Sequence, residues 1–174
     1  VSDYGHGLIS DKTAKLIVKK SKFVAVNTQL NSSNLGFHVI SKYIGANFIT
    51  INETEMRHEL RNKTEHRLPL IKTLSKKLKS KYTHVTSGVM GSIIYHSTLK
   101  EIISCPAFAS KVMDKVGTGD TMLAILAISL FKKFNIKLSM FLSALAAAQN
   151  IQYMANKIPI NKVNITRALQ SYLK

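Results

Sequence analysis

Short apolar runs alternate with longer segments of helical periodicity along most of this 174-residue chain. Strands are expected at residues 23–26, 48–51, 83–86 and 92–95, and helices at 11–20, 34–43, 54–61, 69–79, 119–132, 139–155 and 163–173. Such alternation is typical of a mostly parallel sheet whose faces are covered by helices, so the predicted fold class is α/β. Ligands of such sheets bind at the carboxyl ends of the strands.

Polar residues stand at or just beyond several of these expected strand ends. Asn27, Asn52 and Thr86 each follow an apolar run, which predicts one shared cleft at that edge of the sheet. Asn52 with Glu55 three residues later is also a variant of the capping box, and spacing alone favours that role.

A second candidate site begins at Gly117-Thr118-Gly119-Asp120, after which no charged residue occurs before Lys132. The uncharged run predicts a buried helix with the glycines at its N-terminus, where unpaired N–H groups and the helix dipole favour an anion. Asp120 would then lie near a hydroxyl that attacks a bound phosphate. The alternative is that Asp120 only caps the first helical turn.

These segments together resemble the ribokinase-like sugar kinases, also called the phosphofructokinase-B family. Residues 113–122 resemble the family's Asp-Thr-x-Gly-Ala-Gly-Asp motif, and residues 2–7 resemble the Asp-Tyr-Gly-Lys-Gly turn of its heptose-phosphate kinases. Residues 27–29, 52–55 and 86–91 resemble a strand-end asparagine segment, the Asn-x-x-Glu motif and the Thr-x-Gly-x-x-Gly turn. Lys115, Thr118 and His6 depart from the usual Thr, Ala and Lys.

The resemblance spans nearly the whole chain and corresponds to the C-terminal half of such a kinase. It implies a three-layer α/β/α, Rossmann-like ribokinase fold, with residues 1–174 as one nucleotide-binding domain. The N-terminal half, which holds much of the sugar site and the lid, is expected to be absent, because the chain opens on Val1 and reaches Asp3-Tyr4-Gly5 at once. A natural short protein with a processed start is the alternative.

The same resemblance implies a role for each candidate residue. Asp120 would be the catalytic base, and Gly117, Thr118 and Gly119 would form the anion hole for the γ-phosphate. The nucleotide would be bordered by Asn27, Thr86, Gly88 and Gly91, although Gly88 and Gly91 also suit a tight hairpin. Asn52 and Glu55 would organise Mg²⁺, mainly through water. Asp114 is a candidate for a monovalent cation site, which would make K⁺ a second metal beside the Mg²⁺ of ATP.

The net charge of +16 comes from 25 Lys+Arg against nine Asp+Glu and makes nucleic acid a competing partner. Nine basic residues fall between Arg57 and Lys81, where Ile71, Leu74 and Leu78 form an apolar helical stripe. Lys76, Lys77, Lys79 and Lys81 would project from the opposite face, which indicates a solvated surface rather than a nucleic-acid site. The single Cys105 and the lack of a targeting segment favour a cytoplasmic location. Polar interruptions argue against a membrane helix at 138–156.

Three functions therefore remain open. The first is the nucleotide-binding half of an ATP-dependent kinase for a sugar or sugar phosphate, with a heptose phosphate first. The second is a non-catalytic nucleotide-binding or interaction module derived from such a kinase, and the third is a basic nucleic-acid-binding protein. The expected partners are adenine nucleotide, the sugar and the preceding half of the kinase, with a homodimer left open. We expect the isolated chain to bind nucleotide weakly and to phosphorylate no sugar.

Overall fold

The computed structural model describes residues 1–30, 39–109, 116–152 and 159–172. These residues form two compact units, each of which has its own set of internal contacts. The first unit comprises residues 1–87 and 92–104, and the second comprises residues 88–91 and 105–174. Each unit is described by itself, and the prediction of a single domain stays a prediction.

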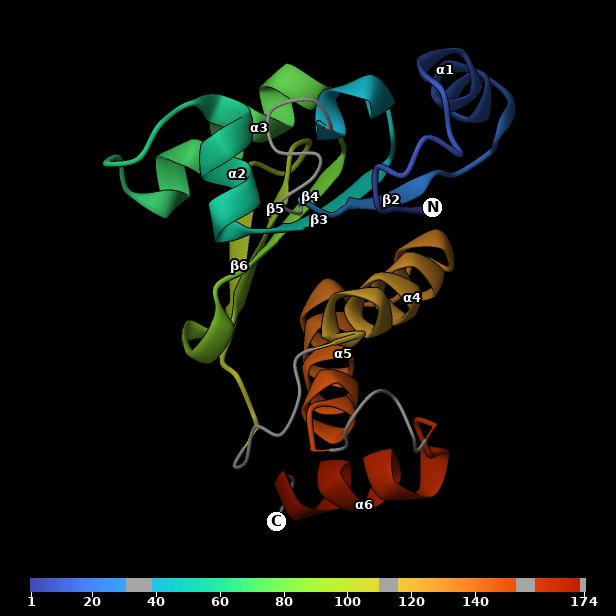
Figure 1. Ribbon diagram of the computed structural model, residues 1–174. Coiled ribbons are helices and arrows are strands. Elements are labelled where there is room, and N and C mark those ends of the chain that lie inside the picture. Colours follow the sequence, from blue (N-terminus) through green and yellow to red (C-terminus); the bar gives the residue numbers. More distant parts are fainter. Residues whose placement is uncertain (31–38, 110–115, 153–158, 173–174) are drawn as a thin grey trace. The chain divides into compact units, whose positions relative to one another are not determined.

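The first unit is built on a six-stranded sheet with the order β1-β2-β3-β4-β5-β6 (Figure 1). Its strands are β1 (Ser2–Asp3), β2 (Ala25–Thr28), β3 (Phe48–Asn52), β4 (Tyr82–Thr86), β5 (Ser92–His96) and β6 (Glu101–Cys105), whose last residue belongs to the second unit. Strands β1 to β4 are parallel and β5 is antiparallel to β4. The register pairs Asn27 with Thr50 and Asn52 with Thr86, which brings these strand ends to one edge.

One face of this sheet is covered by α1 (Asp11–Lys20), the 3₁₀ helix η1 (Ile40–Tyr43), α2 (Glu53–Leu60) and α3 (Arg67–Leu78), as Figure 1 shows. Because side chains alternate along a strand, Ile49 and Ile51 of β3 point to these helices and share a core with Leu70 and Leu74 of α3. Ser10 caps α1 by accepting a hydrogen bond from the Thr13 N–H at 3.2 Å.

The short first strand is held by a buried carboxylate. Asp3 accepts a 2.6 Å hydrogen bond from the Tyr43 hydroxyl and pairs with Lys42 at 2.6 Å. Its other oxygen accepts the Gly5 N–H at 3.0 Å, which shapes the turn after β1. Burial, with the nearby Asp3 charge, raises the pKa of Tyr43. The phenol therefore stays a hydrogen-bond donor to Asp3, and η1 is tied to the sheet.

The second unit contains the 3₁₀ turn η2 (Gly88–Met90) and the helices α4 (Thr118–Phe131), α5 (Ile136–Asn150) and α6 (Lys162–Tyr172). Helices α4 and α5 bury apolar side chains such as Leu126 and Met140. Phe108, Phe141 and Tyr172 form an edge-to-face cluster with ring centroids 5.0–5.9 Å apart, which holds α5 and α6 together. Among the described residues, every helix falls short of the length and apolar character that crossing a bilayer requires.

The α/β class and the mostly parallel sheet are confirmed. Most expected elements occur within a few residues of their predicted bounds, and β4 and β5 are joined through the predicted glycine turn. Two strands were missed, β1 and β6. The helix expected at 34–43 is a 3₁₀ turn in its described part, Ile40–Tyr43, and residues 34–38 lie outside the described residues.

Candidate functional site

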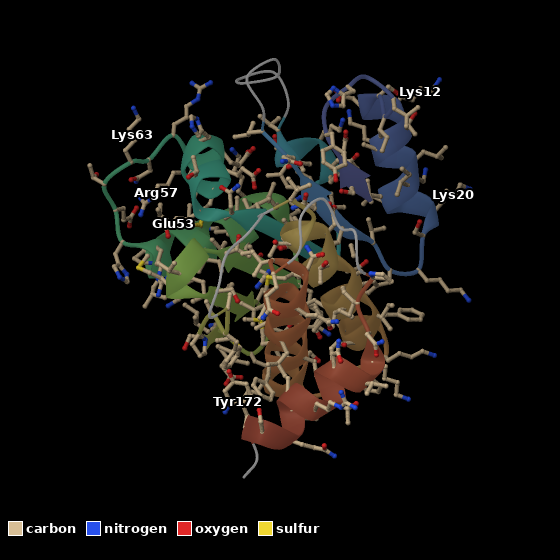
Figure 2. All side chains as sticks on the ribbon, turned by 60° about the horizontal axis from the view of Figure 1, so that its bottom comes forward. Lys12, Lys20, Glu53, Arg57, Lys63 and Tyr172 are labelled. Atoms are coloured by element: carbon tan, nitrogen blue, oxygen red, sulfur yellow. The ribbon has the colours of Figure 1, made fainter. Side chains whose placement is uncertain are left out.

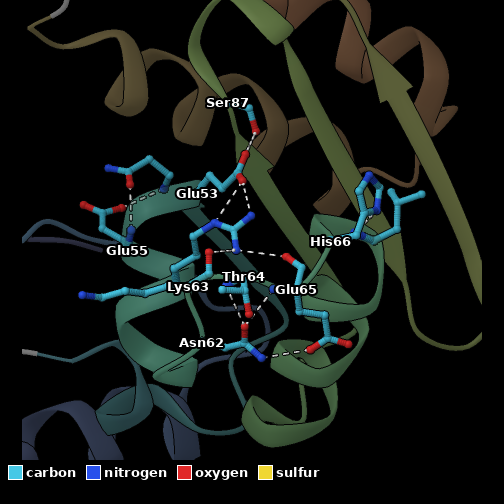
Figure 3. Close-up of polar contacts among 11 residues, drawn as sticks. Glu53, Glu55, Asn62, Lys63, Thr64, Glu65, His66 and Ser87 are labelled. Atoms are coloured by element: carbon cyan, nitrogen blue, oxygen red, sulfur yellow. Dashed lines mark hydrogen bonds and ion pairs between the residues drawn. The ribbon is translucent and has the colours of Figure 1, made fainter.

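Asn52 and Glu55 form a complete capping box at the end of β3, where α2 begins (Figure 3). The Asn52 side chain accepts the Glu55 N–H at 2.8 Å, and Glu55 in return accepts the Asn52 N–H at 2.7 Å. The other Glu55 oxygen accepts the Leu30 N–H at 3.2 Å, which ties the segment after β2 to α2. The local spacing thus produces the cap that it predicts, and it buries a carboxylate at the carboxyl edge of the sheet.

A second carboxylate, Glu53, joins the ends of β3 and β4. One oxygen accepts hydrogen bonds from the Arg57 guanidinium at 2.7 and 3.1 Å, and the other accepts the Ser87 hydroxyl at 2.8 Å (Figure 3). These bonds from Arg57 and then Ser87 hold the pKa of Glu53 below its ordinary value. Arg57 also donates to the carbonyl groups of Lys63 and Glu65, so it braces the loop between α2 and α3.

Asn27 and Thr86 complete this edge of the first unit. The Asn27 side chain donates to the Thr50 carbonyl at 2.9 Å, and the partly exposed Thr86 lies opposite Asn52 in the register. Behind them, the Thr50 hydroxyl and His84 Nδ1 are 2.8 Å apart. Burial lowers the pKa of His84 to about 3, so this ring is neutral at pH 7.

The turn Gly88–Gly91 belongs to the second unit, and both glycines have positive φ, 57° and 77°. The Gly91 N–H donates to the Gly88 carbonyl at 3.0 Å. A Cβ on Gly91 would overlap the Cys105 carbonyl oxygen, whereas a Cβ on Gly88 would meet nothing within 4 Å. Gly91 is therefore required by close packing of two backbone segments, and the space beside Gly88 is open.

The second unit also presents the N-terminus of α4. Gly117 is its N-cap with φ 78°, and the first intrahelical bond runs from the Thr121 N–H to the Gly117 carbonyl at 2.9 Å. The N–H groups of Thr118 and Gly119 precede that bond and so lack an intrahelical acceptor. A Cβ on Gly119 would meet nothing within 4 Å, and Asp120 lies in this first turn. The backbone is thus arranged to receive an anion.

Two side chains near this helix end, Asn150 and Gln149, were not predicted as site residues from the sequence. Asn150 at the end of α5 donates to the Val116 carbonyl at 3.2 Å and supports the segment that enters α4. Among the described residues, the shielded Thr118 hydroxyl and both polar atoms of the Gln149 side chain have no hydrogen-bond partner. Shielded polar groups of this kind are costly unless something else satisfies them, so they are candidates for ligand contacts.

The candidate residues therefore fall into two groups. Asn27, Asn52, Glu55 and Thr86 lie together at the carboxyl edge of the sheet in the first unit. The second unit holds Gly88, Gly91, Gly117, Thr118, Gly119 and Asp120. Asp114 lies outside the described residues.

The residues at the sheet edge fit magnesium only through water. Within the described part of the chain, no group of three or more His, Cys, Asp or Glu could hold a metal directly. Both Glu55 oxygens accept backbone N–H groups, so direct coordination would compete with the cap. A carboxylate oxygen can accept more than one hydrogen bond, and Mg²⁺ commonly keeps several waters. Contact through water is compatible with the geometry.

Comparisons with known proteins agree with one family. The pfkB family carbohydrate kinase profile matches residues 9–162. The chain is 32% identical over 152 residues to the bifunctional protein HldE of Campylobacter curvus, a match that covers 85% of this chain and 31% of that protein. It is 36% identical over 101 residues to HldE of Helicobacter pylori, covering 56% of this chain and 21% of that protein.

Solved structures show the same fold. Phosphofructokinase-2 from Escherichia coli in complex with potassium superimposes with a TM-score of 0.77 at 11% identity, over 95% of this chain and 54% of that one. Ribokinase of Arabidopsis thaliana complexed with ribose and ATP gives 0.70 at 21% identity, over 92% and 51%. The matches thus cover about a fifth to a half of the length of these proteins. With its ribokinase-like fold and a family match over residues 9–162, this chain belongs to the pfkB family of carbohydrate kinases.

Proposed function

We propose that this chain supplies the nucleotide site, the anion hole and the catalytic base for ATP-dependent phosphorylation of a sugar or sugar phosphate. The observation that carries the proposal is the N-terminus of α4, where the N–H groups of Thr118 and Gly119 lack an intrahelical acceptor, a Cβ on Gly119 would meet nothing within 4 Å, and Asp120 follows in the first turn. The family match supports the class of reaction.

The proposed chemistry is a direct transfer of the γ-phosphoryl group. The Asp120 carboxylate accepts the proton of the attacking sugar hydroxyl, the hydroxyl oxygen bonds to the γ-phosphorus, and the bond to the β–γ bridging oxygen breaks to release ADP. The amides of Thr118 and Gly119 hold the charge that develops on the γ-phosphoryl oxygens. Such transfers need little covalent chemistry from the protein, so positioning and charge stabilisation dominate.

The first unit has a supporting role in this proposal. Asn27 and Thr86 border the nucleotide, and Glu55 with Asn52 orders water around Mg²⁺, which neutralises phosphate charge when bound. The Glu53–Arg57–Ser87 contacts keep the ends of β3 and β4 fixed relative to each other. The Gln149 side chain, which has no hydrogen-bond partner in the part of the chain that the structure describes, is our candidate for a polar contact to the nucleotide, since both its amide atoms are shielded from water.

A heptose phosphate is the first substrate to test. Residues 2–7 resemble the turn of heptose-phosphate kinases, and the similarity to HldE proteins of Campylobacter and Helicobacter supports that choice. A panel of sugars and sugar phosphates, assayed by coupled ADP release with the complete protein, tests it. Transfer to a heptose phosphate above all other acceptors is the expected result, and strong preference for a different sugar would contradict the choice.

Nucleotide binding is tested separately at Gly119. A Gly119→Val variant should bind an ATP analogue at least about tenfold more weakly, because a branched side chain would occupy the open space beside the amides. The φ of Gly119 lies outside the left-handed region, so backbone strain is not the cause. Titration calorimetry on the folded variant measures the change. Unchanged affinity would mean that the glycines serve only the turn.

The alternative is a non-catalytic nucleotide-binding module derived from a kinase. Such a module would bind ATP but would have no use for a base at Asp120. It is distinguished by the absence of ADP release with every acceptor in the panel, in a protein that still binds the ATP analogue.

A further inference from the structure

The first unit contains a groove of about 640 Å³ at the end of the sheet opposite to Asn52 and Thr86. It lies where α3 ends, where β4 begins and where β5 ends. Six of its lining residues matter here: Lys72, Lys76, Lys79, Lys81, Ser97 and Thr98. Strand β4 runs from Tyr82 to Thr86, so four steps of about 3.3 Å separate the groove from the candidate site by roughly 13 Å.

The groove concentrates positive charge without local compensation. No carboxylate is among the residues that line it. Two other lysines of this unit form ion pairs: Lys42 with Asp3 at 2.6 Å and Lys77 with Glu59 at 2.6 Å. The four groove lysines make no ion pair to any residue that the structure describes. Lys81 instead lies over the Tyr82 ring, 5.2 Å from its centroid.

A solvated helix face does not account for this arrangement. The C-terminus of α3 favours a nearby cation, but Lys76 and Lys77 in its last turn already supply two. Lys72 lies a turn earlier, and Lys81 directly precedes β4, yet both line the same groove. Lys72, Lys76, Lys79 and Lys81 all belong to the lining of this groove, so their like charges repel one another and raise the local positive potential. A multiply charged anion would relieve that repulsion.

We propose that this groove is a second ligand site, which binds a compact anion carrying several phosphate charges. Ser97 and Thr98 add hydroxyl groups beside the lysines, a mixture that suits phosphate oxygens. The volume is that of a small-molecule pocket. Tyr95 is the one aromatic side chain among the lining residues, so a run of bases would find only a single ring to stack on. This favours a compact polyphosphate over a polynucleotide.

The test is titration calorimetry of the complete protein with inorganic tripolyphosphate at low ionic strength. The test variant is Lys72→Gln/Lys76→Gln. The matched control is Lys15→Gln/Lys19→Gln on α1, which has the same i, i+4 spacing, the same exposure and the same loss of two charges. Both pairs also place their second lysine in the last turn of a helix. The neighbouring Lys12 and Lys20 extend from α1 on the surface in Figure 2.

We expect one tripolyphosphate per chain to bind at the groove, in addition to any that enters the anion hole of the proposed function. The groove variant should weaken the groove binding about tenfold or more, and the α1 control should stay within about twofold. If the groove variant fails to fold, Ser97→Ala/Thr98→Val replaces it, with an expected loss of a few fold at unchanged net charge. Equal losses in the groove variant and the control would show attraction by net charge alone, and no wild-type binding would refute the site.

A single-stranded oligonucleotide is the remaining arm of the experiment. If it binds at least tenfold more tightly than tripolyphosphate, and the groove variant weakens it over the α1 control, the occupant is a nucleic-acid backbone and the proposal of a compact ligand is wrong. Weaker oligonucleotide binding than tripolyphosphate binding supports the proposal.

Discussion

The two glycines of the β4–β5 turn offer a matched pair of substitutions. Gly88 and Gly91 lie three residues apart in the same turn, and both have positive φ. An alanine at either position therefore costs about 1–2 kcal/mol of left-handed strain, of which 0.4–1 kcal/mol is offset by the reduced freedom of the unfolded chain. Strain alone predicts that each variant loses about 1 kcal/mol of unfolding free energy.

The neighbours separate the two positions. A Cβ on Gly88 meets nothing within 4 Å, whereas a Cβ on Gly91 overlaps the Cys105 carbonyl oxygen and lies 2.8 Å from two backbone atoms of Pro106. Backbone atoms cannot swing aside as a flexible side chain can, so this overlap adds about 1–3 kcal/mol or more. We expect Gly91→Ala to be less stable than Gly88→Ala by about 2 kcal/mol.

Urea denaturation followed by circular dichroism measures the difference. With a slope of about 2 kcal/mol per molar urea, the midpoint of Gly91→Ala should fall about 1 M below that of Gly88→Ala. Equal slopes in the two variants are the check that the midpoints can be compared. Equal midpoints would refute the reasoning, because they would mean that the close approach of Gly91 to Cys105 is not part of the folded protein.

Three further predictions concern stability. His84 is buried with its pKa lowered to about 3, so between about pH 6.5 and 3 the unfolded chain binds a proton at this residue that the folded chain does not. The unfolding free energy should therefore fall with decreasing pH in this range by up to about 1.4 kcal/mol per pH unit. A His84→Gln variant measured from pH 7 to 4 should lose stability less steeply than wild type, and parallel curves would contradict this. Because the pKa of Glu53 is lowered in the folded protein, its carboxylate stabilises the fold above the ordinary pKa, and this stability is lost as pH falls through the folded pKa. The difference in unfolding free energy between wild type and Glu53→Gln should therefore shrink as the pH falls from 6 to 3, and a constant difference would argue against this role. Tyr43→Phe removes a hydrogen bond to buried Asp3 and should lower the unfolding free energy by about 1.5–3 kcal/mol in thermal or urea unfolding. A loss of less than about 0.5 kcal/mol would show that this bond does not hold β1.

Local patterns account for what the sequence could predict. The capping box needs only Asn52 and Glu55 three residues apart, and the N-terminus of α4 needs only its glycines and the uncharged run that follows. Both are set by neighbours along the chain. The carboxyl-edge position of Asn27 and Thr86 follows from the strand pattern in the same way.

Features that depend on distant segments could not be predicted. Strand β1 has two residues and exists through its pairing with β2, and β6 has only Ile102 and Ile103 as a short apolar run. The strict need for Gly91 comes from its close approach to the backbone of Cys105, which lies fourteen positions later in the sequence. Nothing in the sequence marks Gln149 as a side chain without a hydrogen-bond partner among the described residues, since a glutamine in an apolar helix usually finds one.

The lysines of the groove show the same contrast between local patterns, which the sequence reveals, and contacts with distant segments, which it does not. The exposure of Lys76, Lys77, Lys79 and Lys81 was predicted correctly from the apolar stripe of α3 and the solvated face opposite to it. The grouping of the groove lysines depends on the antiparallel return of β5, which brings Ser97 beside Lys81 through a 2.9 Å bond from the Ser97 N–H to the Lys81 carbonyl. Periodicity along one helix contains no information about that return.

The role of Asp120 is the central claim, and an Asp120→Asn variant of the complete protein tests it most directly. The measurement is kcat for ADP release with the best acceptor, together with the affinity for an ATP analogue. If the carboxylate accepts the hydroxyl proton, kcat falls by about 10²–10⁴-fold while nucleotide affinity stays within a few fold, because the neighbouring amides are unchanged. A variant that keeps more than about a tenth of the wild-type kcat would contradict the assignment.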